Sequence, residues 1–135
     1  MLRCQYALLS EFVREGQRNT LDVLGIFDRI FVRSLPSQRE QLALVFLLVA
    51  DSEDDLGKHP FRLRFLTPGG KLIFEQSSTF EVRAEAGTWL GSARLLFRIR
   101  SVPLTEHGKY RFRLDVDGEE IADHPLTVAP ENAAK

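Results

Sequence analysis

The sequence is short of cysteine, tryptophan and methionine, with one residue of each among its 135. The single cysteine, Cys4, excludes an intrachain disulfide, and a small domain built without disulfides fits a reducing compartment. Lys and Arg number 18 against 19 Asp and Glu, a net charge of -1, so the basic excess typical of nucleic-acid-binding domains is missing. We therefore expect no nucleic-acid partner that binds over the whole domain, and a local basic patch stays an open alternative.

Long apolar runs are missing as well. The longest, residues 42–50, is far too short to cross a bilayer as a helix. The first residues lack the basic leader, long apolar stretch and cleavage site of a signal peptide. We expect a cytoplasmic protein with no membrane span.

What the sequence has in quantity is alternation of apolar and polar residues at period two. The clearest case is FRLRF at residues 61–65, and the pattern recurs at residues 95–100 and 110–116. Such alternation puts one side of a strand on a core and the other in water, as in antiparallel sheets. Residues 67–70 (TPGG) and 117–118 (DG) lie between apolar runs and predict hairpin turns. The sequence therefore predicts an all-β protein.

The alternation and the turns divide the chain into eight predicted strands. These are residues 3–14, 21–32, 42–50, 61–67, 71–82, 93–102, 109–116 and 119–128. Residues 5–14 also suit a helix, because their apolar residues fit that period too, and this alternative stays open. We expect a single β-sandwich domain over residues 1–129 and a frayed C-terminal tail over residues 130–135, which are small and polar.

One motif indicates the kind of β-protein. Glu106, Gly108, Tyr110 and Phe112 follow one another at two-residue steps. This spacing resembles the tyrosine corner of immunoglobulin-like sandwiches, where the tyrosine ring packs in the core and its hydroxyl bonds backbone. The sequence has no cysteine pair and its tryptophan is not on the third strand, so the resemblance concerns architecture. It implies a two-sheet antiparallel immunoglobulin-like sandwich of about eight strands.

Several segments together resemble a family of small, uncharacterised bacterial proteins. They are YALL at residues 6–9, DVLGIFDRI at 22–30, QLAL at 41–44, GKYRF at 108–112 and VDGE at 116–119. The resemblance spans most of the chain. It implies a bacterial origin and a domain that stands alone, and it implies no activity and no functional residue.

The acidic stretch from Asp51 to Asp55 invites a calcium hypothesis. Read as a helix–loop–helix calcium loop, it would place Leu56 where glycine is required and Arg62 where glutamate is required. A calcium site between loops stays an alternative, but a solvated turn is the favoured interpretation because acidic loops are common. We expect no metal and no cofactor.

The sequence offers no catalytic set. Glu119 and Glu120 are neighbours on a predicted strand and point to opposite faces, so they cannot act together. Cys4 would need a histidine brought close by the fold to become a nucleophile. The three histidines lack the spacing of a zinc pair: His59, His107 and His124. We therefore expect a non-enzymatic protein.

Residues 42–50 (LALVFLLVA) are apolar at consecutive positions and hence on both faces of a strand. Because a solvated sheet face should be polar, something must cover the second face. The sequence leaves three alternatives for what covers this face: the loop 80–91 with Trp89 as a plug, the N-terminal segment, or another protein.

The same strand supplies the predicted protein-binding surface. If it pairs with residues 109–116, as the immunoglobulin pattern expects, arginines border its outer face, and arginine is enriched at interfaces. The candidate protein-binding residues are Val45, Leu47, Val49, Arg62, Arg64, Arg111 and Arg113. Arginines that merely solubilise strand exteriors are the competing explanation.

We interpret the chain as an interaction module that self-associates or docks on a partner protein. The alternative is a ligand-binding β-sandwich, for a sugar or for calcium and lipid, that uses loops at one end. In that case Trp89, between Gly87 and Gly91, would stack on a sugar ring, although a tryptophan of this kind is more often a buried lid. The sequence does not identify a small-molecule ligand.

Overall fold

The computed structural model describes residues 1–87 and 90–134, and in this part of the chain the regular elements are strands and short 3-10 helices. The strands are β1 (Arg3–Glu15), β2 (Leu21–Ile26), β3 (Arg29–Val32), β4 (Ser37–Val49), β5 (Gly57–Leu66), β6 (Leu72–Ala84), β7 (Gly91–Leu104), β8 (Gly108–Val116) and β9 (Glu119–Pro130). The helices are η1 (Gln17–Asn19), η2 (Glu53–Asp55) and η3 (Glu131–Ala134). No helix in the described part is long and apolar enough to cross a membrane. The all-β prediction is confirmed.

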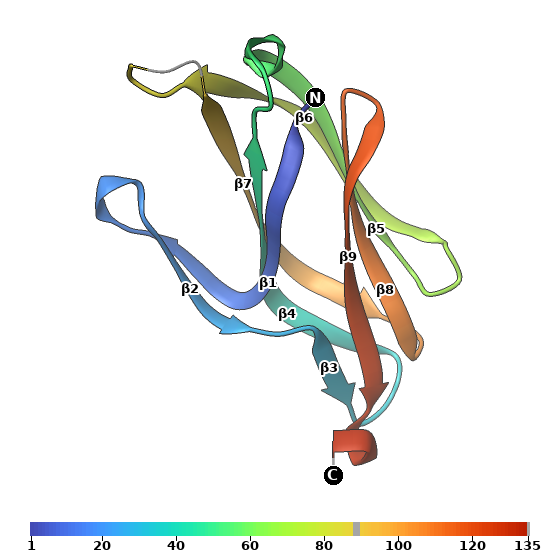
Figure 1. Cartoon of the computed structure of the whole chain (residues 1–135). Coiled ribbons are helices and arrows are strands. Elements are labelled where there is room, and N and C mark those ends of the chain that lie inside the picture. The colour runs from blue at the N-terminus through green and yellow to red at the C-terminus, as the bar shows by residue number, and fades with distance from the viewer. Residues whose placement is uncertain (88–89, 135) are drawn as a thin grey trace.

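The strands form one continuous hydrogen-bonded sheet in the order β2-β1-β4-β7-β6-β5-β8-β9-β3, which curls on itself (Figure 1). β6 joins the two halves, because it pairs with β5 over most of its length and with β7 only at Arg83↔Ser92 and Ala84↔Gly91. β3 runs parallel to β9. The expected two antiparallel sheets of about eight strands are therefore corrected to one curled, mixed sheet of nine.

The ninth strand arises because the segment predicted as one strand, residues 21–32, is divided. Gly25 has a φ of +70°, a left-handed conformation that favours glycine. Beyond it the Phe27 N–H donates to the Leu9 carbonyl and the Thr127 N–H donates to the Asp28 carbonyl, each at 2.9 Å. The chain thus leaves the edge of β1 and crosses to the edge of β9, so that β2 and β3 belong to opposite ends of the sheet.

A single main core lies between the two halves of the curled sheet. β4 contributes alternate side chains to it, including Leu44 and Phe46, and the opposite half contributes Phe65 and Phe112. β1 pairs with β4 and buries Leu9 completely, so the helical alternative for residues 5–14 is wrong. Burial of one face by apolar side chains at period two is what fixes the register of these strands.

The tyrosine corner is present. Tyr110 on β8 is fully buried, and its hydroxyl accepts hydrogen bonds from the backbone N–H groups of Thr105 at 3.0 Å and Glu106 at 3.1 Å. The same hydroxyl donates to the Glu106 carbonyl at 3.0 Å. The side chain therefore provides hydrogen-bond partners for three backbone groups of the β7–β8 loop and ties this loop to the core.

Replacing Tyr110 with phenylalanine should lower the free energy of unfolding by about 1–3 kcal/mol, because three backbone hydrogen bonds are lost while the ring is kept. Urea unfolding measures the effect. Tyr6→Phe is the matched control, since the Tyr6 hydroxyl makes no hydrogen bond within the described residues. A loss of similar size in both variants would contradict the role of the corner.

Candidate interaction surface

The second face of β4 is covered by the chain itself. Ala43 and Val45 point away from the main core and are buried in a second, smaller cluster with Val13 of β1. Leu21 and Val23 of β2 pack against this cluster. Figure 1 shows how this is achieved: β1 bends sharply at its lower end, and the β1–β2 hairpin runs back beside β7. The cover is thus the N-terminal segment, one of the three possibilities left open by the sequence.

A groove of about 430 Å³ lies between the turn of this hairpin and the outer face of β4 and β7. Leu47 and Leu96 form apolar parts of its wall, and Arg94 reaches across to the hairpin. The Arg94 guanidinium donates to the Asn19 carbonyl at 3.3 and 3.4 Å, which ties the hairpin turn to β7. The remaining lining residues are Glu15, Gly16, Thr20 and Ser92.

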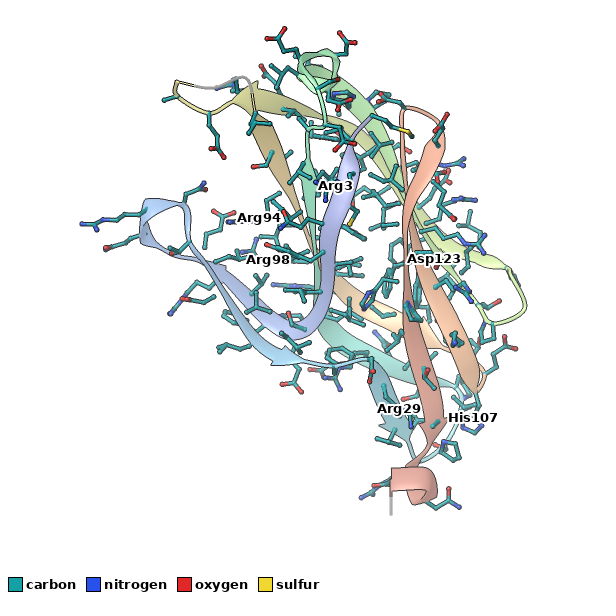
Figure 2. All side chains as sticks on the ribbon, in the orientation of Figure 1. Arg3, Arg29, Arg94, Arg98, His107 and Asp123 are labelled. Atoms are coloured by element: carbon teal, nitrogen blue, oxygen red, sulfur yellow. The ribbon has the colours of Figure 1, made fainter. Side chains whose placement is uncertain are left out.

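A row of arginines continues from this groove along β7. Register with β4 places Arg94 beside Leu47, Leu96 beside Val45, and Arg98 beside Ala43 on one face. Arg100 follows two residues later and is exposed, as are Arg94 and Arg98. Figure 2 shows Arg94 and Arg98 on the side of the sheet toward which the hairpin bends. We call Arg94, Leu96, Arg98, Arg100 and Leu47 the β7 arginine face.

The arginines of this face differ from most others in their charge partners. Within the described part of the chain, the arginines that make no ion pair and no hydrogen bond are Arg18, Arg29, Arg98 and Arg100. Two of these four are neighbours on the β7 arginine face. The face therefore carries positive charge that the described residues do not neutralise.

The arginines predicted as binding residues lie elsewhere. β4 pairs with β1 and β7, so the expected pairing of residues 42–50 with residues 109–116 is wrong. β8 pairs instead with β5 and β9 in the other half of the curled sheet. The structure therefore brings Arg62, Arg64, Arg111 and Arg113 together, but it separates them from Val45, Leu47 and Val49.

These four arginines bind carboxylates. Arg62 and Arg64 both contact Asp115, at 3.0 and 3.2 Å. Arg111 pairs with Asp123 at 2.7 Å, and Arg113 lies near Asp123 and Glu120. Of the predicted apolar residues, Val45 is fully buried, whereas Leu47 and Val49 are half-buried. Their binding role stays a prediction, and Trp89 lies outside the described residues.

The acidic stretch contains a structural carboxylate. Asp55 is buried, and its side chain accepts hydrogen bonds from the backbone N–H groups of Asp51 at 2.7 Å and Ser52 at 3.2 Å. Its other oxygen lies 2.8 Å from the amino group of Met1. Burial acts to raise the pKa of Asp55, but the amino group and the backbone donors outweigh it and hold the pKa below its usual value. Residues 1–87 and 90–134 contain no group of three or more acidic, histidine or cysteine side chains placed to hold a metal.

This pKa shift predicts acid sensitivity. Since the folded-state pKa is depressed, Asp55 stabilises the fold above its usual pKa, and this stability is lost as the pH falls through the folded-state value. Asp55→Asn should lower the free energy of unfolding at pH 7 by about 1–3 kcal/mol and by less near pH 2. Urea unfolding at both pH values tests this. Asp54→Asn, at an exposed neighbouring position, should change neither value; an equal effect of the two substitutions would rule out the role of Asp55.

Cys4 does not have the environment of a nucleophile. The thiol is half-buried, and its sulfur lies 3.3 Å from the Tyr6 carbonyl oxygen. Burial raises the pKa of the Cys4 thiol, which keeps it protonated, whereas a reactive cysteine requires a lowered pKa.

A second recess lies at the seam where the edge of β1 approaches β9. It has a volume of about 260 Å³ and is lined by Leu9, Ile26, Phe27, Asp28 and His124, among others. The His124 Nε2 atom is buried and has no hydrogen-bond partner in the described part of the chain. Burial lowers the pKa of His124, although Asp28 and Asp123 oppose the shift. The volume lies below the range of about 300–1,000 Å³ typical of small-molecule sites.

The curled all-β sheet with its tyrosine corner places the chain in the class of immunoglobulin-like β-proteins. Residues 5–129 match the model of DUF6941, a family of unknown function, and the chain belongs to this family. The resemblance to an uncharacterised family is thereby confirmed. No curated protein matches the chain.

The solved structures that are similar to this chain include the following two. One is the alkylpurine DNA glycosylase AlkC of Pseudomonas fluorescens, bound to DNA containing an abasic site analog, with 10% sequence identity and a TM-score of 0.52. The match covers 95% of this chain and 30% of the glycosylase chain, so this chain spans less than a third of that protein. The other is an immunoglobulin-like protein of Pseudomonas aeruginosa, with 14% identity, a TM-score of 0.42, and coverage of 95% and 96%.

Proposed function

We propose that this chain is a non-enzymatic, immunoglobulin-like protein-interaction module whose contact surface is the β7 arginine face. The observation that supports the proposal is that Arg98 and Arg100 are exposed beside the half-buried Leu47 and Leu96 and have no carboxylate partner among the described residues. Arginines around an apolar centre are enriched at protein interfaces, where their long side chains contribute both charge and contact area.

The lining of the groove favours a protein over a small molecule. Small-molecule sites are mostly apolar with a few placed polar groups, whereas this groove has two leucines among Glu15, Asn19, Thr20, Ser92 and Arg94. The alternative of a ligand site at loops near Trp89 stays a prediction. None of the residues that form the β7 arginine face requires an enclosed small molecule as a partner.

Charge also favours a protein over a nucleic acid. The DNA glycosylase with a similar fold was solved with DNA, but this chain has a net charge of -1 and one carboxylate, Glu15, inside the groove itself. Nucleic-acid surfaces carry a larger basic excess. We place the module in the cytoplasm, in keeping with its single unpaired cysteine.

Docking on a different protein is favoured over self-association. The apolar second face of β4 is already covered by the β1–β2 hairpin, so it does not require a second copy. A two-fold contact through the β7 arginine face would also set arginine against arginine, which is unfavourable. We therefore expect a monomer in solution, to be checked by light scattering at several protein concentrations.

The double variant Arg98→Glu/Arg100→Glu should lose its partner without unfolding, because both side chains are exposed and unpaired. The matched control is Arg29→Glu/Lys109→Glu, which makes the same charge change at two exposed residues that both neighbour Thr127 in the other half of the sheet. Each version is used to isolate bound proteins from cell extract, and each protein found is then purified and titrated by calorimetry.

The expected result is a protein that binds the unchanged chain and the control but binds the β7 variant at least about tenfold more weakly. Thermal unfolding confirms that the variants are folded. A purified partner that binds all three versions equally would overturn the proposed surface.

A further inference from the structure

We infer that the partner contributes an extended acidic segment, which adds as a strand along the free edge of β7. The inference rests on the proposed function and deepens it, because it specifies both the chemistry of the partner and the way in which it is held. Three features of β7 support it: an edge without a strand partner, a row of unneutralised arginines beside that edge, and a structural limit on its length.

The edge of β7 that faces away from β4 is open. On one side β7 pairs with β4 from Ser92 to Leu104. On the other side it pairs with β6 only through Gly91 and Ser92, because β6 then diverges to pair with β5. From residue 93 onward no backbone hydrogen bond joins this edge to the rest of the described chain. Unpaired N–H and C=O groups along such an edge are a template for an added strand.

The side chains beside the edge specify the charge of that strand. Leu95 and Phe97 point into the core, whereas Arg94, Arg98 and Arg100 point outward with Leu96 among them. Alternate side chains of an added strand would lie on the same outer face, with their Cβ atoms about 4.5–5.5 Å from those of β7. Carboxylates opposite Arg98 and Arg100, and an apolar residue opposite Leu96, would complement this face.

The end of the edge is also defined. Ser101 has a φ of +57°, outside the range of an extended strand, and Pro103 has no N–H to donate. The regular part of the open edge therefore runs from Ala93 to Arg100. An extended segment of about eight or nine residues matches this length.

A second copy of the chain does not fit this edge. Pairing β7 with β7 of another copy would place one row of arginines opposite another, and like charges directly opposite each other destabilise a strand pair. Charged side chains on edges commonly serve only to prevent such pairing. The experiment must therefore distinguish an edge that repels other strands from one that accepts an acidic strand.

The probe is a fluorescent peptide of about nine residues in which every second residue is glutamate, except for one leucine placed to lie opposite Leu96, and the residues between them are valine. Binding is measured by anisotropy. Two further peptides carry N-methyl groups at the odd or at the even positions. In an added strand, the N–H groups of every second residue face β7. One methylated peptide should therefore bind at least about tenfold more weakly, and the other should bind like the parent peptide.

The arginine variants test the charge of the surface. Arg98→Glu/Arg100→Glu should weaken binding of the parent peptide about tenfold, and the control Arg29→Glu/Lys109→Glu should not.

Four outcomes would overturn the inference. Equal binding of both methylated peptides, with the arginine dependence kept, would mean a side-chain contact at the proposed surface without strand addition. Absence of peptide binding would exclude the acidic strand, while loss of the natural partner by the arginine variant would still support the proposed function. Single-stranded DNA of equal charge is tested in the same way. If it binds with the same dependence on Arg98 and Arg100, the surface binds a nucleic acid and the proposal of an acidic protein segment is wrong. If neither peptide nor natural partner depends on Arg98 and Arg100, the inference and the proposed function fail together.

Discussion

β4 buries side chains on both of its faces, and much of the N-terminal half of the structure follows from the need to cover them. On one face Leu42, Leu44, Phe46 and Leu48 enter the main core. On the other face Ala43 and Val45 would be exposed if the sheet were flat. Because buried apolar area is the dominant favourable term in folding, the bend of β1 that returns the hairpin over this face is a condition for the fold. The groove beside β7 is the space that remains where the hairpin turn ends.

The two halves of the curled sheet differ in how their outer charges are paired. In the β5–β8–β9 region, carboxylates lie among the arginines of adjacent strands: Asp115 lies opposite Arg62 and contacts both Arg62 and Arg64. This arrangement neutralises the outer face and gives strand pairs of opposite charge, which stabilise a sheet. Beyond residue 92, β7 has no strand on its far side to supply such partners, and Arg98 and Arg100 on its outer face have no carboxylate partner within the described part of the chain. The difference between the two surfaces is thus a consequence of strand order.

Local parts of this structure could be predicted from the sequence. Asp117 and Gly118 both adopt positive φ, as the predicted two-residue hairpin turn requires, and the tyrosine corner follows from residues within five positions of Tyr110. The division of residues 21–32 could not be predicted, because the crossing at Asp28 depends on the position of Thr127 about a hundred residues later. Alternation shows that a strand has a buried face, but it carries no information about the strand beside it.

The same limit explains the outcome for the candidate surface. The doubly apolar strand was identified correctly as a feature that needs explanation, since nine consecutive apolar residues are visible in the sequence alone. The arginines that border it could not be identified, because that choice depends on whether β7 or β8 is its neighbour. The alternation at residues 95–100 did contain a signal, namely two arginines, Arg98 and Arg100, with no acidic residue between positions 86 and 105 to neutralise them.

The open edge of β7 exposes unpaired backbone N–H and C=O groups, which other strands can pair with. Bulges and prolines commonly protect edges by disrupting the ladder itself, and β7 has such features only at its end, at Ser101 and Pro103. Over residues 93–100 the backbone stays regular, and protection comes from charge alone. Charge excludes a second β7 and any basic strand, but it attracts an acidic one, so the protection is selective. On the proposed function, a regular edge bordered only by charge of one sign would disfavour self-association and accept a partner of the opposite sign.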